Sequence, residues 1–249
     1  MRKVVLLALG AFLAFAAYAA AEPRDSVSRQ FPLYENGGKA DLTVDPKRFV
    51  SQMEIVDRWF DAGSCELVEG SVNGSGYRRI LRFDTVIINA GGADLALGSP
   101  TDPDNPYVQA GVFEFSPCHG HYHMSGFADY QLLTTDGAVA APGHKQAFCF
   151  ISTLKYSNDL NGQDKPSYSC ADQGIARGYG DWYYKQLSGQ WIDITGVPEG
   201  DYVVRVAIDA AGSFDEGENR YTNVVTTTIH VPDPRKKVAS STESLSYEQ

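Results

Sequence analysis

Cysteine and histidine are scarce in this sequence, which contains 4 and 5 of them among 249 residues. So few cysteines exclude a disulfide-dense scaffold, and so few histidines exclude an array of zinc modules. Positive charge is also scarce, because 21 Lys and Arg stand against 31 Asp and Glu, and the net charge of -10 excludes an obvious nucleic-acid-binding protein. Hydrophobic residues, at 43% of the chain, are too frequent for an intrinsically disordered protein.

Long apolar runs are also absent, except at the N-terminus. Arg2 and Lys3 precede an apolar run over 4–17, and small residues follow it. The run is shorter than the roughly 20 residues of a spanning helix, so the pattern predicts a cleaved signal peptide over 1–21, with an uncleaved anchor as the alternative. Cleavage leaves 19 Lys and Arg against 31 Asp and Glu, a net charge of -12. We therefore expect a secreted or periplasmic protein with no membrane span, in a compartment where disulfides persist.

Helical stripes of apolar residues are missing, whereas short strand patterns recur along the chain. We expect strands at 42–46, 53–60, 77–84, 86–88, 112–115, 127–133, 191–195, 202–208 and 222–231. The sequence therefore predicts a mainly β fold, with a single β-sandwich-like domain over 41–232 that carries long irregular loops. The segment 155–189 is the longest of these loops. An irregular lead-in over 22–40 and a disordered tail over 233–249 would flank the domain.

Three of the five histidines lie within five residues, at His119, His121 and His123. Side chains on a strand alternate between faces, so these three imidazoles would share one face of an extended strand. Three neutral imidazoles directed at one point are suitable ligands for Cu(II) or for catalytic zinc. The alternatives are a row of solvated surface histidines and a zinc hydrolase, although Met124 and Ser125 stand where such hydrolases continue with Asp-His.

The stretch SPCHGHYH, followed by FADYQLL, resembles the copper-binding segment of the lysyl oxidase family. Further stretches agree with that family in order and spacing: GHKQAFC at 143–149, QWIDIT at 190–195, PEGDY at 198–202 and YTNVV at 221–225. The resemblance covers residues 77–231 and is closest in form to bacterial members. It implies that the domain over 41–232 is a copper- and quinone-dependent amine oxidase. Such an enzyme uses O2 to deaminate primary amines or peptidyl lysine to aldehydes, and it releases hydrogen peroxide and ammonia.

The resemblance also implies which residues form the site. Copper would be bound by the three clustered histidines, and the family's organic cofactor, lysine tyrosylquinone, would form from Lys145 and Tyr183. The tyrosine is placed by counting eight residues back from Trp191, so Tyr184 and Tyr179 remain alternatives. Lys145 must lose its proton before it can add to the oxidised ring, and burial lowers the pKa of a lysine. Both residues would then be catalytic as well as cofactor-forming.

The animal enzymes imply a disulfide between Cys118 and Cys170. That pairing leaves Cys65 and Cys149, whose pairing with each other is possible by parity and is not decided by the sequence. Asp181, two residues before the expected quinone tyrosine, is the nearest candidate for the catalytic base. The alternative function is a non-enzymatic extracytoplasmic copper-binding protein that keeps the histidines but never forms the quinone.

Overall fold

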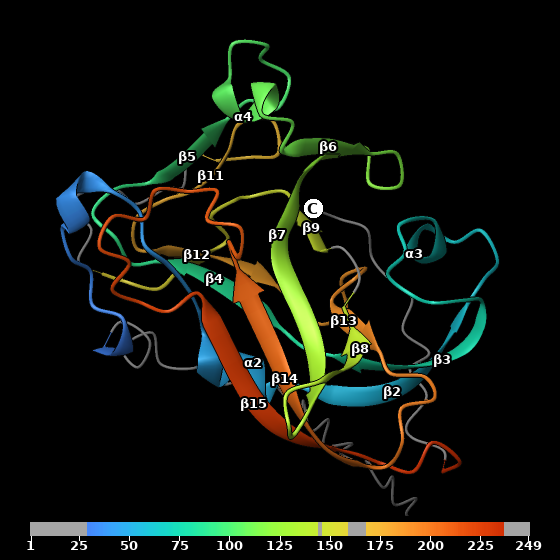
Figure 1. Cartoon of the computed structure of the whole chain (residues 1–249). Coiled ribbons are helices and arrows are strands. Elements are labelled where there is room, and N and C mark those ends of the chain that lie inside the picture. The colour runs from blue at the N-terminus through green and yellow to red at the C-terminus, as the bar shows by residue number, and fades with distance from the viewer. Residues whose placement is uncertain (1–28, 144–145, 159–167, 237–249) are drawn as a thin grey trace, which may run out of the picture.

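Antiparallel strands are the main secondary structure of the computed structural model, which describes residues 29–143, 146–158 and 168–236 (Figure 1). The largest sheet has the strand order β15-β14-β7-β6, and two short strands also pair with β7. Its strands are β6 (Phe113–Ser116), β7 (His121–Thr134), β8 (Val139–Pro142), β9 (Gln146–Phe148), β14 (Gly200–Ile208) and β15 (Val224–Val231). The prediction of a mainly β, single-domain fold is confirmed.

A second sheet, with the order β1-β4-β12-β10, lies against the first. It contains β1 (Leu42–Val44), β4 (Thr85–Asn89), β10 (Leu154–Lys155) and β12 (Tyr179–Tyr183). The main core is shared by the two sheets, and in Figure 1 the long strands β7 and β14 cross in front of β4 and β12. Buried side chains from both sheets meet there, among them Leu42, Ile87, Tyr130, Tyr183, Val204 and Val206.

Two smaller sheets complete the described strands. One has the order β13-β3-β2, from β2 (Glu54–Phe60), β3 (Gly76–Arg82) and β13 (Trp191–Asp193), and the other pairs β5 (Leu95–Gly98) with β11 (Gln173–Ile175). Opposite charges fix the register of β2 and β3, because Arg79 is paired with Asp57 at 2.9 Å and Arg82 with Glu54 at 2.7 Å, each directly across the ladder.

The described helices are short, and the sequence pattern predicted none of them. They are the 3-10 helix η1 (Asn36–Gly38) and the α-helices α2 (Pro46–Ser51), α3 (Cys65–Val68) and α4 (Pro106–Gln109). Capping explains α2, since the Asp45 side chain accepts hydrogen bonds from the backbone N–H groups of Lys47 and Arg48. A helix of this length has no room for a periodic apolar stripe, so capping residues are its only signal.

The disulfides differ from the expected pairing. Cys65 is bonded to Cys118 and Cys149 to Cys170, with Cα–Cα distances of 5.7 and 5.4 Å. The predicted Cys118–Cys170 bridge is therefore wrong, and so is a Cys65–Cys149 pair. The reason is spatial, because the turn that carries Cys118 lies beside α3, whereas the loop before β11 returns to the end of β9.

The segments expected to flank the domain contribute contacts where the structure describes them. Phe31 packs with Val86 and Ile88 in a second apolar cluster, and Arg79 donates hydrogen bonds to the carbonyl oxygens of Asp233 and Lys236. The expected signal peptide lies outside the described residues. Within the described ranges, no helix combines the length and the apolar character needed to cross a bilayer.

Candidate metal centre and tyrosine site

The clustered histidines lie in the turn of the β6–β7 hairpin and at the start of β7. His121 and His123 are on β7, where they pair with Ser116 and Glu114, but His119 is in the turn that joins the two strands. The prediction of one extended strand is therefore wrong for His119. Gly120 explains the difference, because its φ of 71° is in the left-handed region and reverses the chain just before β7.

The hairpin nevertheless brings the three imidazoles together. One ring nitrogen from each of His119, His121 and His123 lies within 4.8 Å of the others, and the Nε2 atoms of His121 and His123 are 3.0 Å apart. Burial and the neighbouring His119 lower the pKa of His121, which favours the neutral imidazole that binds metals. Three imidazole nitrogens at this spacing fit a single copper or zinc ion.

A carboxylate stands beside the turn histidine. Glu69 Oε2 lies 3.2 Å from His119 Nε2, and Glu69 Oε1 accepts a 2.6 Å hydrogen bond from the Ser116 hydroxyl. The same Ser116 oxygen accepts a hydrogen bond from the backbone N–H of His119 at 3.1 Å. Glu69 did not figure in the predicted site, because it is 50 residues away from its partner in the sequence.

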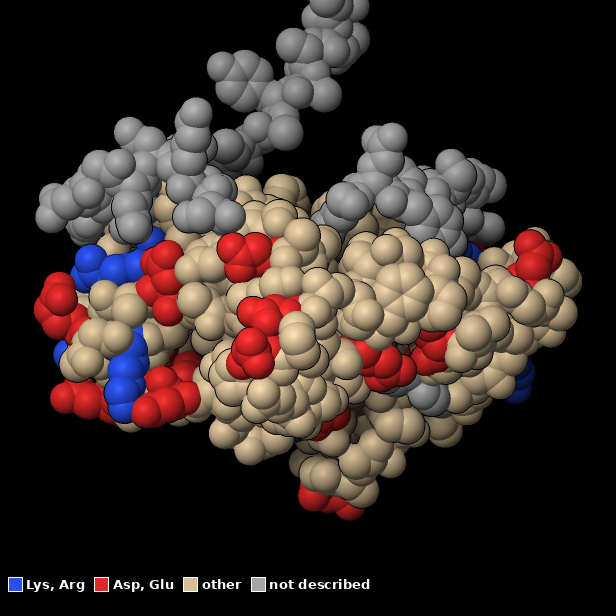
Figure 2. Space-filling view, turned by 90° about the horizontal axis from the view of Figure 1, so that it is seen from above, with Lys and Arg blue, Asp and Glu red and all other residues tan. Residues whose placement is uncertain are grey.

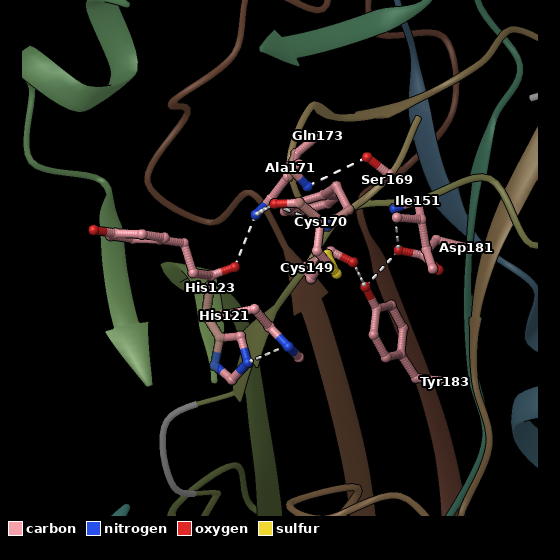
Figure 3. The surroundings of a disulfide bond; sticks show 12 residues. His121, His123, Cys149, Ile151, Ser169, Cys170, Ala171, Gln173, Asp181 and Tyr183 are labelled. Carbon is pink, nitrogen blue, oxygen red and sulfur yellow. Dashed lines mark hydrogen bonds between the residues drawn. A yellow bond between two sulfur atoms is a disulfide. The ribbon is translucent and has the colours of Figure 1, made fainter. Parts of the chain in front are cut away.

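Tyr183 is buried on β12 and points toward a buried carboxyl group (Figure 3). Its hydroxyl donates a hydrogen bond to Asp181 Oδ2 and lies 2.8 Å from the carbonyl oxygen of Cys149. Burial raises the pKa of Asp181 to about 8, and burial together with Asp181 raises the pKa of the Tyr183 phenol well above its usual value. A hydrogen-bonded pair with two raised pKa values is typical of a functional site.

Gln173 connects the histidine strand to the tyrosine. Its fully buried side chain donates from Nε2 to the carbonyl oxygen of Tyr122, between the two strand histidines, at 2.8 Å. Its Oε1 accepts a hydrogen bond from the backbone N–H of Phe150 at 3.1 Å, next to the carbonyl that contacts Tyr183. The Cys149–Cys170 disulfide closes the same region (Figure 3).

The chain matches the family model "Lysyl oxidase" over residues 62–240. The protein belongs to the lysyl oxidase family. Lysyl oxidase homolog 2 of Homo sapiens is 33% identical to it over 195 residues, which cover 74% of this chain and 23% of the relative. Lysyl oxidase homolog 2A of Danio rerio is 34% identical over 196 residues, covering 74% and 24%, and lysyl oxidase homolog 3 of Homo sapiens is 37% identical over 152 residues, covering 59% and 18%. The match spans about a quarter or less of the length of these relatives.

In this lysyl oxidase family member, the structure brings His119, His121 and His123 together as the sequence predicted. Of the three candidate tyrosines, Tyr179 and Tyr183 are buried on β12, and Tyr184 is half-buried after the strand with its ring against Trp182. Lys145 lies outside the described residues. The assignment of Lys145 and Tyr183 as catalytic, cofactor-forming residues therefore stays a prediction.

Proposed function

We propose that this protein is a secreted copper- and quinone-dependent amine oxidase, which oxidises primary amines or peptidyl lysine with O2 to aldehydes, hydrogen peroxide and ammonia. The observation that carries the proposal is the cluster of three histidine nitrogens within 4.8 Å in a chain of the lysyl oxidase family. The buried tyrosine–carboxyl pair, which Gln173 connects to the histidine strand, adds support, because covalent cofactor formation needs a tyrosine that is held in one position.

The residues that would hold the cofactors are His119, His121 and His123 for copper, and Lys145 and Tyr183 for the lysine tyrosylquinone. The quinone would serve as the electron sink for amine oxidation. In its ionised form, which it reaches as the pH rises toward its pKa of about 8, Asp181 would take up the proton of the Tyr183 hydroxyl through the hydrogen bond that already joins the two groups. The backbone carbonyl of Cys149 would fix the orientation of the ring.

Peptide mass spectrometry tests this assignment directly. Protein produced with copper should yield a cross-linked peptide that joins Lys145 to Tyr183, and the same preparation should release hydrogen peroxide with a lysine-containing peptide. Tyr183→Phe should lose both signals. The matched variant Tyr184→Phe, which removes a hydroxyl one residue away, should keep both. Two unmodified peptides from a copper-loaded sample would contradict the enzyme and would instead support the non-enzymatic copper-binding protein.

A further inference from the structure

We propose that Glu69 is a positioning residue of the metal centre, which fixes the ring of His119 by accepting a hydrogen bond from its Nε2–H group. This inference rests on the proposed copper site at His119, His121 and His123. It adds a residue from a separate element, the end of α3, to a site that the sequence motif places on one hairpin.

The geometry forms a closed ring of three hydrogen bonds. His119 donates from its backbone N–H to Ser116 Oγ at 3.1 Å, Ser116 donates to Glu69 Oε1 at 2.6 Å, and Glu69 Oε2 returns to the imidazole of His119 at 3.2 Å. Both carboxylate oxygens are therefore occupied by the hairpin. The side chains of His119 and Glu69 are mostly buried, at 19% and 28% exposure, which strengthens the contact relative to a surface pair.

The two strand histidines are supported differently from His119. His121 and His123 are held by the pairing of β7 with β6, whereas His119 lies in the turn, where no ladder fixes the chain. The protein supplies the missing constraint from α3 in two ways. The Cys65–Cys118 disulfide ties the start of the helix to the residue before His119, and Glu69 closes the helix by donating from its backbone N–H to the Cys65 carbonyl at 2.8 Å.

Metal-binding chemistry explains why a carboxylate is useful at this place. A histidine that donates from one ring nitrogen to a carboxylate is fixed in one tautomer, and its other nitrogen becomes a more basic ligand. With the proton on Nε2 facing Glu69, His119 would offer Nδ1 to the metal. Removal of such a partner typically weakens metal affinity by about 10–100-fold.

Copper affinity of the full chain tests the proposal. We would measure Cu(II) binding against a competing chelator, and the EPR spectrum of the loaded protein, for the wild type, Glu69→Ala, Glu69→Gln and the control Glu199→Ala. Glu199 is an exposed carboxylate whose described ionic contact is with His230. Glu69→Ala should lose about 10–100-fold in affinity with an altered EPR spectrum. Glu69→Gln should lose less, because its amide oxygen still accepts the hydrogen bond, and Glu199→Ala should match the wild type.

Two results would overturn the inference. If Glu69→Ala has the copper affinity and the EPR spectrum of the wild type, the contact does not position His119. If Glu69→Gln binds copper as weakly as Glu69→Ala, the negative charge of Glu69 matters and the hydrogen bond does not. Thermal melts and thiol titration check that each variant is folded with both disulfides. If Glu69→Ala does not fold, Glu69→Gln decides through its copper affinity, which must fall below that of the wild type. A wild type that binds no copper, or a His119→Ala variant with unchanged affinity, would instead refute the proposed function.

Discussion

At the scale of the residue, the buried pair of Asp181 and Tyr183 is the least usual feature of the molecule. A carboxyl group with no exposed surface is costly when ionised, and burial raises the pKa of Asp181 to about 8. The hydrogen bond from Tyr183 and another from the backbone N–H of Ile151 offset only part of that cost. The carboxyl group is therefore mainly protonated at neutral pH and is close to the point where it can exchange its proton.

This pair predicts a pH dependence of stability. The folded-state pKa of Asp181 lies above its ordinary value of 3.8, so its contribution to stability is present in full below pH 3.8 and is lost as the pH rises toward 8. Asn cannot titrate. The melting temperature of Asp181→Asn relative to the wild type should therefore increase between pH 4.5 and 8. The increase should be about 2–4 °C or more, because one pKa unit is worth about 1.4 kcal/mol and each kcal/mol shifts the melting temperature of a domain of this size by about 2–4 °C. Differential scanning fluorimetry measures this.

The matched control is Asp104→Asn, which removes an exposed carboxylate from the loop before α4. Its melting temperature relative to the wild type should stay level over the same pH range. A constant difference for Asp181→Asn as well would mean that Asp181 does not gain a proton on folding.

At the scale of the element, strand periodicity predicted most of the large sheet but not the contacts that complete the site. β7, β14 and β15 contain runs rich in aliphatic, β-branched and aromatic residues that end at turn residues, so their positions could be predicted. β12 could not, because its apolar residues are interrupted by Gly180 and Asp181, and tertiary packing rather than local pattern makes it a central strand. The disulfides and Glu69 depend on which distant segments meet, and one sequence contains no direct record of that.

Gln173 on β11 gives a prediction at this scale. Gln173→Leu keeps the volume but leaves the partly buried Tyr122 carbonyl and the buried Phe150 N–H without their partner, which should lower the free energy of unfolding by about 2–4 kcal/mol. Copper affinity should fall as well, since the contact holds the strand between His121 and His123. Denaturant unfolding without reductant measures the first effect. Gln109→Leu, at an exposed position of α4, should change stability by less than about 0.5 kcal/mol, and an equal change in both variants would contradict the role of Gln173.

At the scale of the whole molecule, charge is the dominant property. The net charge is -10, and Figure 2 shows Asp and Glu side chains spread across the face seen from above, with Lys and Arg visible mainly toward one side. A lysine-rich substrate is cationic, so the field of such a protein would accelerate its capture. The negative net charge, from which the sequence predicts no nucleic-acid partner, thus agrees with the proposed substrates.

Salt dependence tests this idea. The Debye length falls from about 30 Å at 0.01 M salt to about 3 Å at 1 M, so long-range attraction should disappear over that range. We expect kcat/KM for a peptide with several lysines to fall on the order of tenfold as salt rises, measured by peroxide release. A simple monoamine, with one positive charge, should show a much weaker dependence, because the attraction grows with the charge of the substrate. Equal slopes for the two substrates would show that capture depends on local contacts at the site and not on the field of the whole protein.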